Sequence, residues 1–197
     1  MDLTLSRPTL RDLPSAGFAS SAAVWGVLVA YLVATKLLIT YVFPVAFERG
    51  ANQDAAFSWP VLAVVAVLGL AGIWLAHQTG FPAAIDPRII NRERLLYPAL
   101  VGIGFGILTI VLDLLFGFTR TLAANSGNAT FNVAFPGSVF VYTGGAISVE
   151  VLERIFPLPL LVWLISSLIL RGRGQFAVFW ILAPILALWE PVSVPPK

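Results

Sequence analysis

The sequence predicts an all-α, polytopic membrane helix bundle with about five transmembrane helices. Of its 197 residues, 58% are hydrophobic and only 11% are charged, whereas soluble domains are about 25% charged. A helix that crosses a bilayer needs about 20 mostly apolar residues, and such runs recur along the chain. We expect a single membrane domain over residues 1–197, with spans at residues 18–47, 59–77, 95–118, 143–170 and 176–190.

The first run is long enough to tilt or to overshoot the bilayer. It contains Lys36, and Pro44 near its end is expected to kink or stop the helix. The apolar h-region of a signal peptide has roughly 7–15 residues. Because this run is longer, we expect it to stay in the protein as a membrane helix.

The third run contains "GIGFG", which places Gly102 and Gly106 at GxxxG spacing. Small residues at this spacing let two membrane helices approach closely. No strand precedes these glycines, so they are no nucleotide-binding fingerprint. We therefore predict helix packing at Gly102 and Gly106.

The fourth run carries three charges, Glu150, Glu153 and Arg154. An isolated ion at bilayer depth costs at least about 2.5–3.5 kcal/mol, so such residues face other helices and pair. Glu150 and Arg154 stand four residues apart, on one helix face, and can form an ion pair. Helices that bring Lys36 to Glu153, or Asp113 to Arg154, would complete a structural polar seam that sets helix register.

A functional reading of the same charges stays open. Glu150, Glu153, Asp113 and Glu190 are four acids from three runs. They could assemble an all-oxygen metal site or a proton path.

Basic residues between the runs alternate between a rich and a poor side. Seven lie on one side and three on the other, which by the positive-inside rule puts the N-terminus inside and the C-terminus outside. The richer side has Arg7, Arg11, Arg88, Arg92, Arg94, Arg171 and Arg173, and the poorer side has Arg49, Arg120 and Lys197. They indicate membrane topology and not a nucleic-acid surface.

Cysteine is absent and His77 is the single histidine, which excludes thiolate metal sites and mechanisms that need two imidazoles. His77 is either a polar residue at the interface or a ligand for chlorophyll magnesium or haem iron. The six tryptophans lie largely near predicted helix ends, as an aromatic belt does, or they edge a pigment or quinone. We expect no intrinsic cofactor, with lipid or pigment contacts at the surface.

The stretch "GGAISVEVLERIFPLPLLVWLISSL" resembles the first motif of the CPBP (CAAX protease and bacteriocin-processing) family of intramembrane metalloproteases. That motif reads Glu-Glu-x-x-x-Arg, and anchoring it on Arg154 places its second Glu at Glu150 and its first at Val149. A later family motif, Phe-x-x-x-His, falls on Leu186 and Glu190. The resemblance covers roughly residues 59–191.

The resemblance implies a fold that, in the family, holds a metal and activates a water with paired glutamates and later histidines. That chemistry needs neutral imidazole ligands and a free carboxylate. Here Val149 and Glu190 replace two of the residues, and the chain reaches Lys197 before the remaining ligands. We therefore expect a degenerate, truncated member with no catalytic residues, in which Glu150, Arg154 and Glu190 are vestigial.

The expected function is that of a non-catalytic, CPBP-like accessory or scaffold subunit of a larger membrane complex, photosynthetic or respiratory. Its partners would be other integral membrane subunits and lipids, in a bacterial inner membrane. The alternative is an active CPBP-type metalloprotease with an atypical ligand set, which would bind a divalent metal and lose activity on Glu150→Ala. A transporter is a third class, although no repeat supports alternating access.

Overall fold

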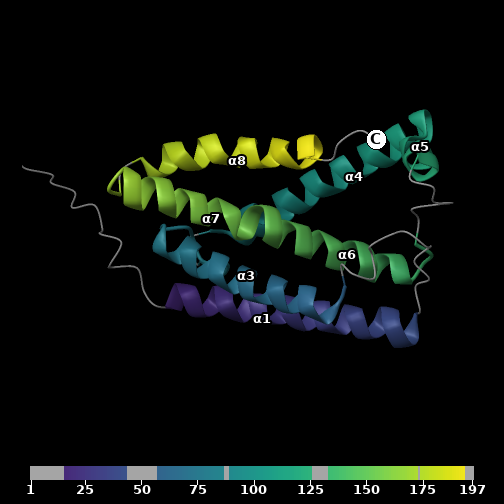
Figure 1. The fold of residues 1–197 in the computed structure, drawn as a ribbon, viewed down its shortest axis with the longest axis horizontal. Helices are drawn as coiled ribbons and strands as arrows, with labels where there is room; N and C mark the ends of the chain where they lie inside the picture. The colour runs from purple at the N-terminus through teal and green to yellow at the C-terminus, as the bar shows by residue number, and fades with distance from the viewer. Residues whose placement is uncertain (1–15, 44–56, 87–88, 126–132, 173, 194–197) are drawn as a thin grey trace, which may run out of the picture. The chain divides into compact units, whose positions relative to one another are not determined.

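The computed structural model describes residues 16–43, 57–86, 89–125, 133–172 and 174–193. Within these ranges the chain is helical apart from turns and short connections (Figure 1), which confirms an all-α membrane helix bundle. The helices are α1 (Ala16–Leu37), α3 (Trp59–Gln78), α4 (Tyr97–Phe116), α5 (Phe118–Asn125), α6 (Gly137–Glu150), α7 (Pro157–Val162) and α8 (Gln175–Ser193). In the part of the chain that the structure describes, π-helical turns extend or join them: η2 (Leu38–Val42), η3 (Arg92–Leu96), η4 (Val151–Ile155) and η5 (Trp163–Ile169).

Among the described residues, four helical stretches are long and apolar enough to cross a membrane, so the chain is an integral membrane protein. They are Gly17–Val42, Trp59–Gln78, Arg92–Phe116 and Gly137–Ile169. The first ends just before Phe43, whose backbone leaves the helical region ahead of Pro44, as a residue before proline tends to do. Residues 44–47 of the first predicted span lie outside the described residues.

The fifth predicted span coincides with α8, which is helical through Pro184. Its described apolar stretch, Gln175–Leu188, is shorter than the other four, so a fifth crossing stays a prediction. A turn at residues 170–172 follows the fourth stretch, and α7 and α8 lie side by side (Figure 1). Gly172 in this turn has a φ of 81°, a left-handed conformation that favours glycine.

The chain divides into two compact units. Unit 1 contains residues 1–29, 65–86 and 149–193, and unit 2 contains residues 30–64, 87–148 and 194–197. Because α1, α3 and α6 each contribute residues to both units, this division does not test the predicted single domain.

Unit 1 is held by two close helix contacts on α3. The indole of Trp25 is 4% exposed and lies against Gly69. Its Nε1–H donates a hydrogen bond of 3.0 Å to the Ala66 carbonyl, which satisfies the polar atom of a large buried aromatic side chain. One turn along α3, Gly72 lies so close to η4 that a Cβ on residue 72 would overlap the Ile155 carbonyl oxygen.

Local sequence explains why η4 can approach α3 so closely. Pro157 and Pro159 follow η4, and a proline has no backbone N–H to give to the carbonyl four residues earlier. Pro159 therefore cannot donate to the Ile155 carbonyl in the α-helical pattern. That carbonyl instead faces Gly72, where the missing side chain leaves room for it.

Unit 2 also contains a close contact at a glycine, Gly144. Gly144 in α6 is buried, and a Cβ there would lie 2.9 Å from the Phe57 ring and 3.2 Å from the Thr35 methyl. Phe43 and Phe140 stack with ring centroids 6.0 Å apart, and the Tyr31 and Thr143 hydroxyls hydrogen-bond to each other. Thr35 is fully buried, and its Oγ1 has no hydrogen-bond partner among the described residues.

We predict that Gly72→Ala destabilises the protein by about 1–3 kcal/mol, because overpacking against backbone cannot be relieved by a side-chain rotation. The measurement is the midpoint of thermal unfolding in detergent. The control is Gly26→Ala on α1, where a Cβ meets nothing within 4 Å and alanine favours the helix. Equal midpoints for the two variants would contradict the close contact.

Candidate functional site: the charged turn η4

The three charges of the fourth span gather at the junction of α6 and η4. The Arg154 guanidinium donates to the Glu150 carboxylate in an ion pair across one turn, as the spacing predicts. Glu153 also has a partner. The paired Glu150 and Arg154 side chains lie inside a helical stretch that is long and apolar enough to cross a membrane.

The ion pair is half-exposed, with each side chain 45% accessible. A charged pair in an apolar medium is stable only when further hydrogen bonds satisfy its remaining donors and acceptors. Lipid chains offer none. The exposed donors and acceptors of the pair therefore need hydrogen bonds from water, a lipid headgroup or a polar group of another protein.

The charges also coincide with a break in the helix. In η4 the Phe156 N–H donates to the Val151 carbonyl, at 3.1 Å, five residues earlier. Single π-helical turns inside α-helices occur frequently at functional sites. The Ile155 carbonyl, which lies against Gly72 of α3, belongs to the same turn. Glu153 and Arg154 therefore project from the segment whose backbone packs against α3.

Asp113 has a local role at the end of α4. Its Oδ1 accepts a hydrogen bond of 2.6 Å from the backbone N–H of Thr119 in α5. Between them, Gly117 ends α4 in a left-handed conformation with φ 65°. Asp113 thus stabilises the turn from α4 into α5, which sequence spacing alone did not indicate.

Lys36, the remaining member of the predicted seam, is half-buried at the end of α1. It has no ion pair with any residue that the structure describes. The predicted pairings of Lys36 with Glu153 and of Asp113 with Arg154 stay predictions.

The glycines of α4 are exposed. A Cβ on Gly102, Gly104 or Gly106 would meet no atom within 4 Å among the described residues. No residue of α4 is buried. The predicted helix packing at Gly102 and Gly106 therefore has no described partner and stays a prediction.

No three His, Asp or Glu side chains gather into a possible metal site within the described part of the chain. The side chain of Glu190 lies outside it, so its predicted vestigial position is untested. His77, at the end of α3, lies with its ring centroid 6.0 Å from that of Phe18. The sequence did not indicate this neighbour, because 59 residues separate the two rings along the chain.

No protein-family model, curated protein or solved structure matches this chain. The class of protein is therefore defined by the fold alone: an all-α integral membrane protein with an ion pair in its fourth apolar stretch.

We predict that Glu150 and Arg154 stabilise each other. Arg154→Gln leaves an unpaired carboxylate in an apolar stretch, so it should cost more stability than the double variant Glu150→Gln/Arg154→Gln. A double-mutant cycle on unfolding in detergent should give a coupling energy of about 0.5–3 kcal/mol. Additive single effects would show that the pair contributes nothing.

We predict that Asp113→Ala loosens the first turn of α5. Loss of one hydrogen bond of about 0.5–1.5 kcal/mol should speed hydrogen exchange at the Thr119 amide roughly two- to tenfold. Asp113→Asn is the control, since its amide oxygen can still accept. Unchanged exchange in Asp113→Ala would remove the assigned role.

Proposed function

We propose that this chain is a non-catalytic accessory subunit that assembles with other integral membrane proteins. The observation that supports it is the half-exposed Glu150–Arg154 pair within an apolar stretch. Polar groups at bilayer depth usually face other helices and not lipid. A neighbouring subunit that hydrogen-bonds this pair is the occupant that suits it best.

The exposed surface of α4 adds to this proposal. The helix carries large apolar side chains and open glycines, and none of its residues is buried. Helix pairs in membranes associate through close packing at small residues. A second helix on Gly102 and Gly106 would use the space that the described chain leaves free.

The finer features of the proposal rest on the sequence. A degenerate CPBP-like member would retain Glu150 and Arg154 as a structural pair, since Arg154 now engages the carboxylate that a protease would need free. The excess of arginines on one side favours a cytoplasmic N-terminus and a periplasmic C-terminus, and the membrane would be a bacterial inner membrane. The host assembly would be a photosynthetic or respiratory complex.

The test is gentle solubilisation of native membranes, followed by native gel, mass spectrometry and metal analysis of the same band. We expect stoichiometric co-migration with larger membrane proteins. Glu150→Gln/Arg154→Gln should reduce co-migration at least severalfold, because it removes both charges and leaves neutral polar side chains in their place. The control is Arg120→Gln, which removes an exposed charge from α5.

Two results would contradict the accessory-subunit proposal. One is a band at the chain's own mass with one divalent metal per chain, which would favour the metalloprotease. The other is co-migration that responds equally to Arg120→Gln and to the double variant, which would move the interface away from η4.

A further inference from the structure

Unit 1 contains a pocket that the proposed function does not use. Its volume is about 270 Å³, and it lies between the start of α1, the end of α3 and the turn that follows α3. The side chains that line it are mostly apolar, and they include the aromatic rings of Phe18, Trp25 and Phe81. Its lining also includes Ser21, Ala76 and His77.

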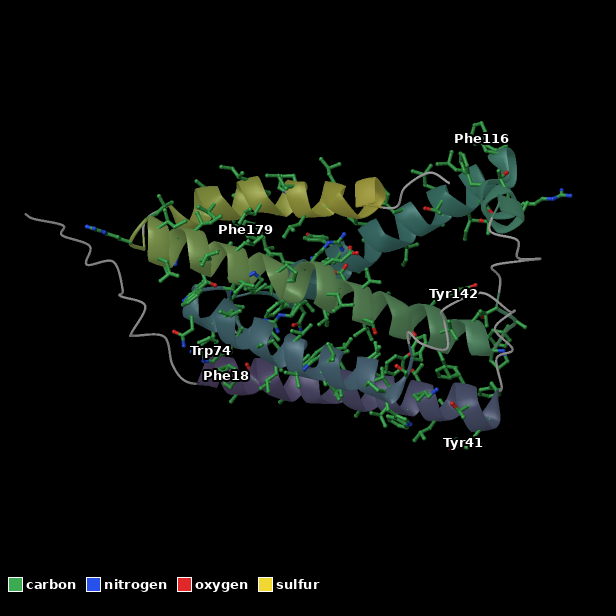
Figure 2. The ribbon with its side chains drawn as sticks, viewed as in Figure 1. Phe18, Tyr41, Trp74, Phe116, Tyr142 and Phe179 are labelled. Carbon is green, nitrogen blue, oxygen red and sulfur yellow. The ribbon has the colours of Figure 1, made fainter. Side chains whose placement is uncertain are left out.

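Two of the aromatic side chains, Trp25 and Phe81, are held in place by contacts outside the pocket. Trp25 is fixed by its hydrogen bond to the Ala66 carbonyl. Phe81 packs edge-on against Phe179 of α8, with ring centroids 5.5 Å apart; Figure 2 shows Phe18 on α1 and Phe179 on α8. The shape of the pocket therefore exists before any ligand arrives, as is usual for small-molecule sites.

The turn over the pocket is fixed in the same way. The Ser21 hydroxyl accepts a hydrogen bond of 2.9 Å from the Ala84 backbone N–H. The Phe81 N–H donates to the Ala76 carbonyl at 3.0 Å, and Gly80 reverses the chain with φ 74°. These bonds hold the turn against the start of α1 and the end of α3.

His77 is the polar group that remains. Its imidazole is half-buried in the pocket wall and contacts the Phe18 ring. No group that the structure describes hydrogen-bonds its ring nitrogens. A neutral imidazole carries one donor and one acceptor, so His77 gives the mostly apolar pocket a side chain that can hydrogen-bond a ligand.

From this geometry we infer that the pocket binds a membrane-soluble amphiphile whose planar ring bears an oxygen, of the quinone and quinol class. Aromatic walls favour a flat ring in stacked or edge-on contact. The ring oxygen would accept from, or donate to, the nitrogen of His77. The pocket lies where α3 ends its apolar stretch, so a hydrocarbon tail could extend into the membrane.

The test uses the fact that the chain has one histidine. The full chain is purified with a histidine-free tag, labelled with ¹⁵N-histidine and placed in lipid nanodiscs. Titration with 2,3-dimethoxy-5-methyl-1,4-benzoquinone should displace the His77 ring signals in a saturable way. Absence of a saturable displacement in the unaltered chain would overturn the inference, whatever the variants do.

Two matched variants test whether the quinone binds in this pocket. Ala76→Phe fills the pocket and should weaken binding at least tenfold. Ala63→Phe adds the same ring to an exposed position on the same helix and should leave binding unchanged. Equal affinities in the two variants would show that the quinone binds elsewhere.

A parallel titration separates the ring from a plain hydrocarbon chain. Decanol has a chain and a hydroxyl but no ring, and it should neither displace the His77 signals to the same extent nor compete with the quinone. Full competition by decanol would make the pocket an acyl-chain site and overturn the assignment to a quinone-type ring.

Discussion

The approach of the Gly72 backbone to the Ile155 carbonyl is the constraint on which unit 1 depends. The contact requires glycine at position 72 of α3, because a side chain would overlap the facing carbonyl. It also requires that the Ile155 carbonyl be left without an α-helical hydrogen bond, which Pro159 ensures because it has no N–H. Ile155 itself lines the same pocket as His77, and Arg154 precedes it on η4. One backbone contact therefore positions both the ion pair and one wall of the pocket.

The two features differ in what they offer to other molecules. The Glu150–Arg154 pair offers charge inside an apolar stretch, which suits a polar group on a neighbouring protein. The pocket offers a rigid apolar space with one imidazole, which suits a small ring. An accessory subunit that also holds a lipid-soluble molecule would combine them without any catalytic residue of its own.

Hydropathy was sufficient to predict the four long helices, because each must satisfy its backbone internally and keep apolar side chains outward. The spacing of Glu150 and Arg154 predicted their ion pair. The π-helical turn at 151–155 and the Gly72 contact could not be predicted, since they depend on which helices pack together. The same is true of Asp113, whose partner Thr119 lies beyond a helix end, and of the Ser21 bond to Ala84, which joins segments 63 residues apart.

The most direct test of this account is a solid-state NMR distance in bilayers. Ile–Phe occurs once in the chain, at Ile155–Phe156, so ¹³C-carbonyl isoleucine with ¹⁵N-phenylalanine selects the Ile155 carbonyl alone. With ¹³Cα-glycine present, the account predicts one glycine Cα within about 5 Å of that carbonyl carbon, because a Cα lies one bond beyond a Cβ. This signal should disappear in Gly72→Ala. A carbonyl with no glycine Cα within reach would contradict the close approach of α3 to η4.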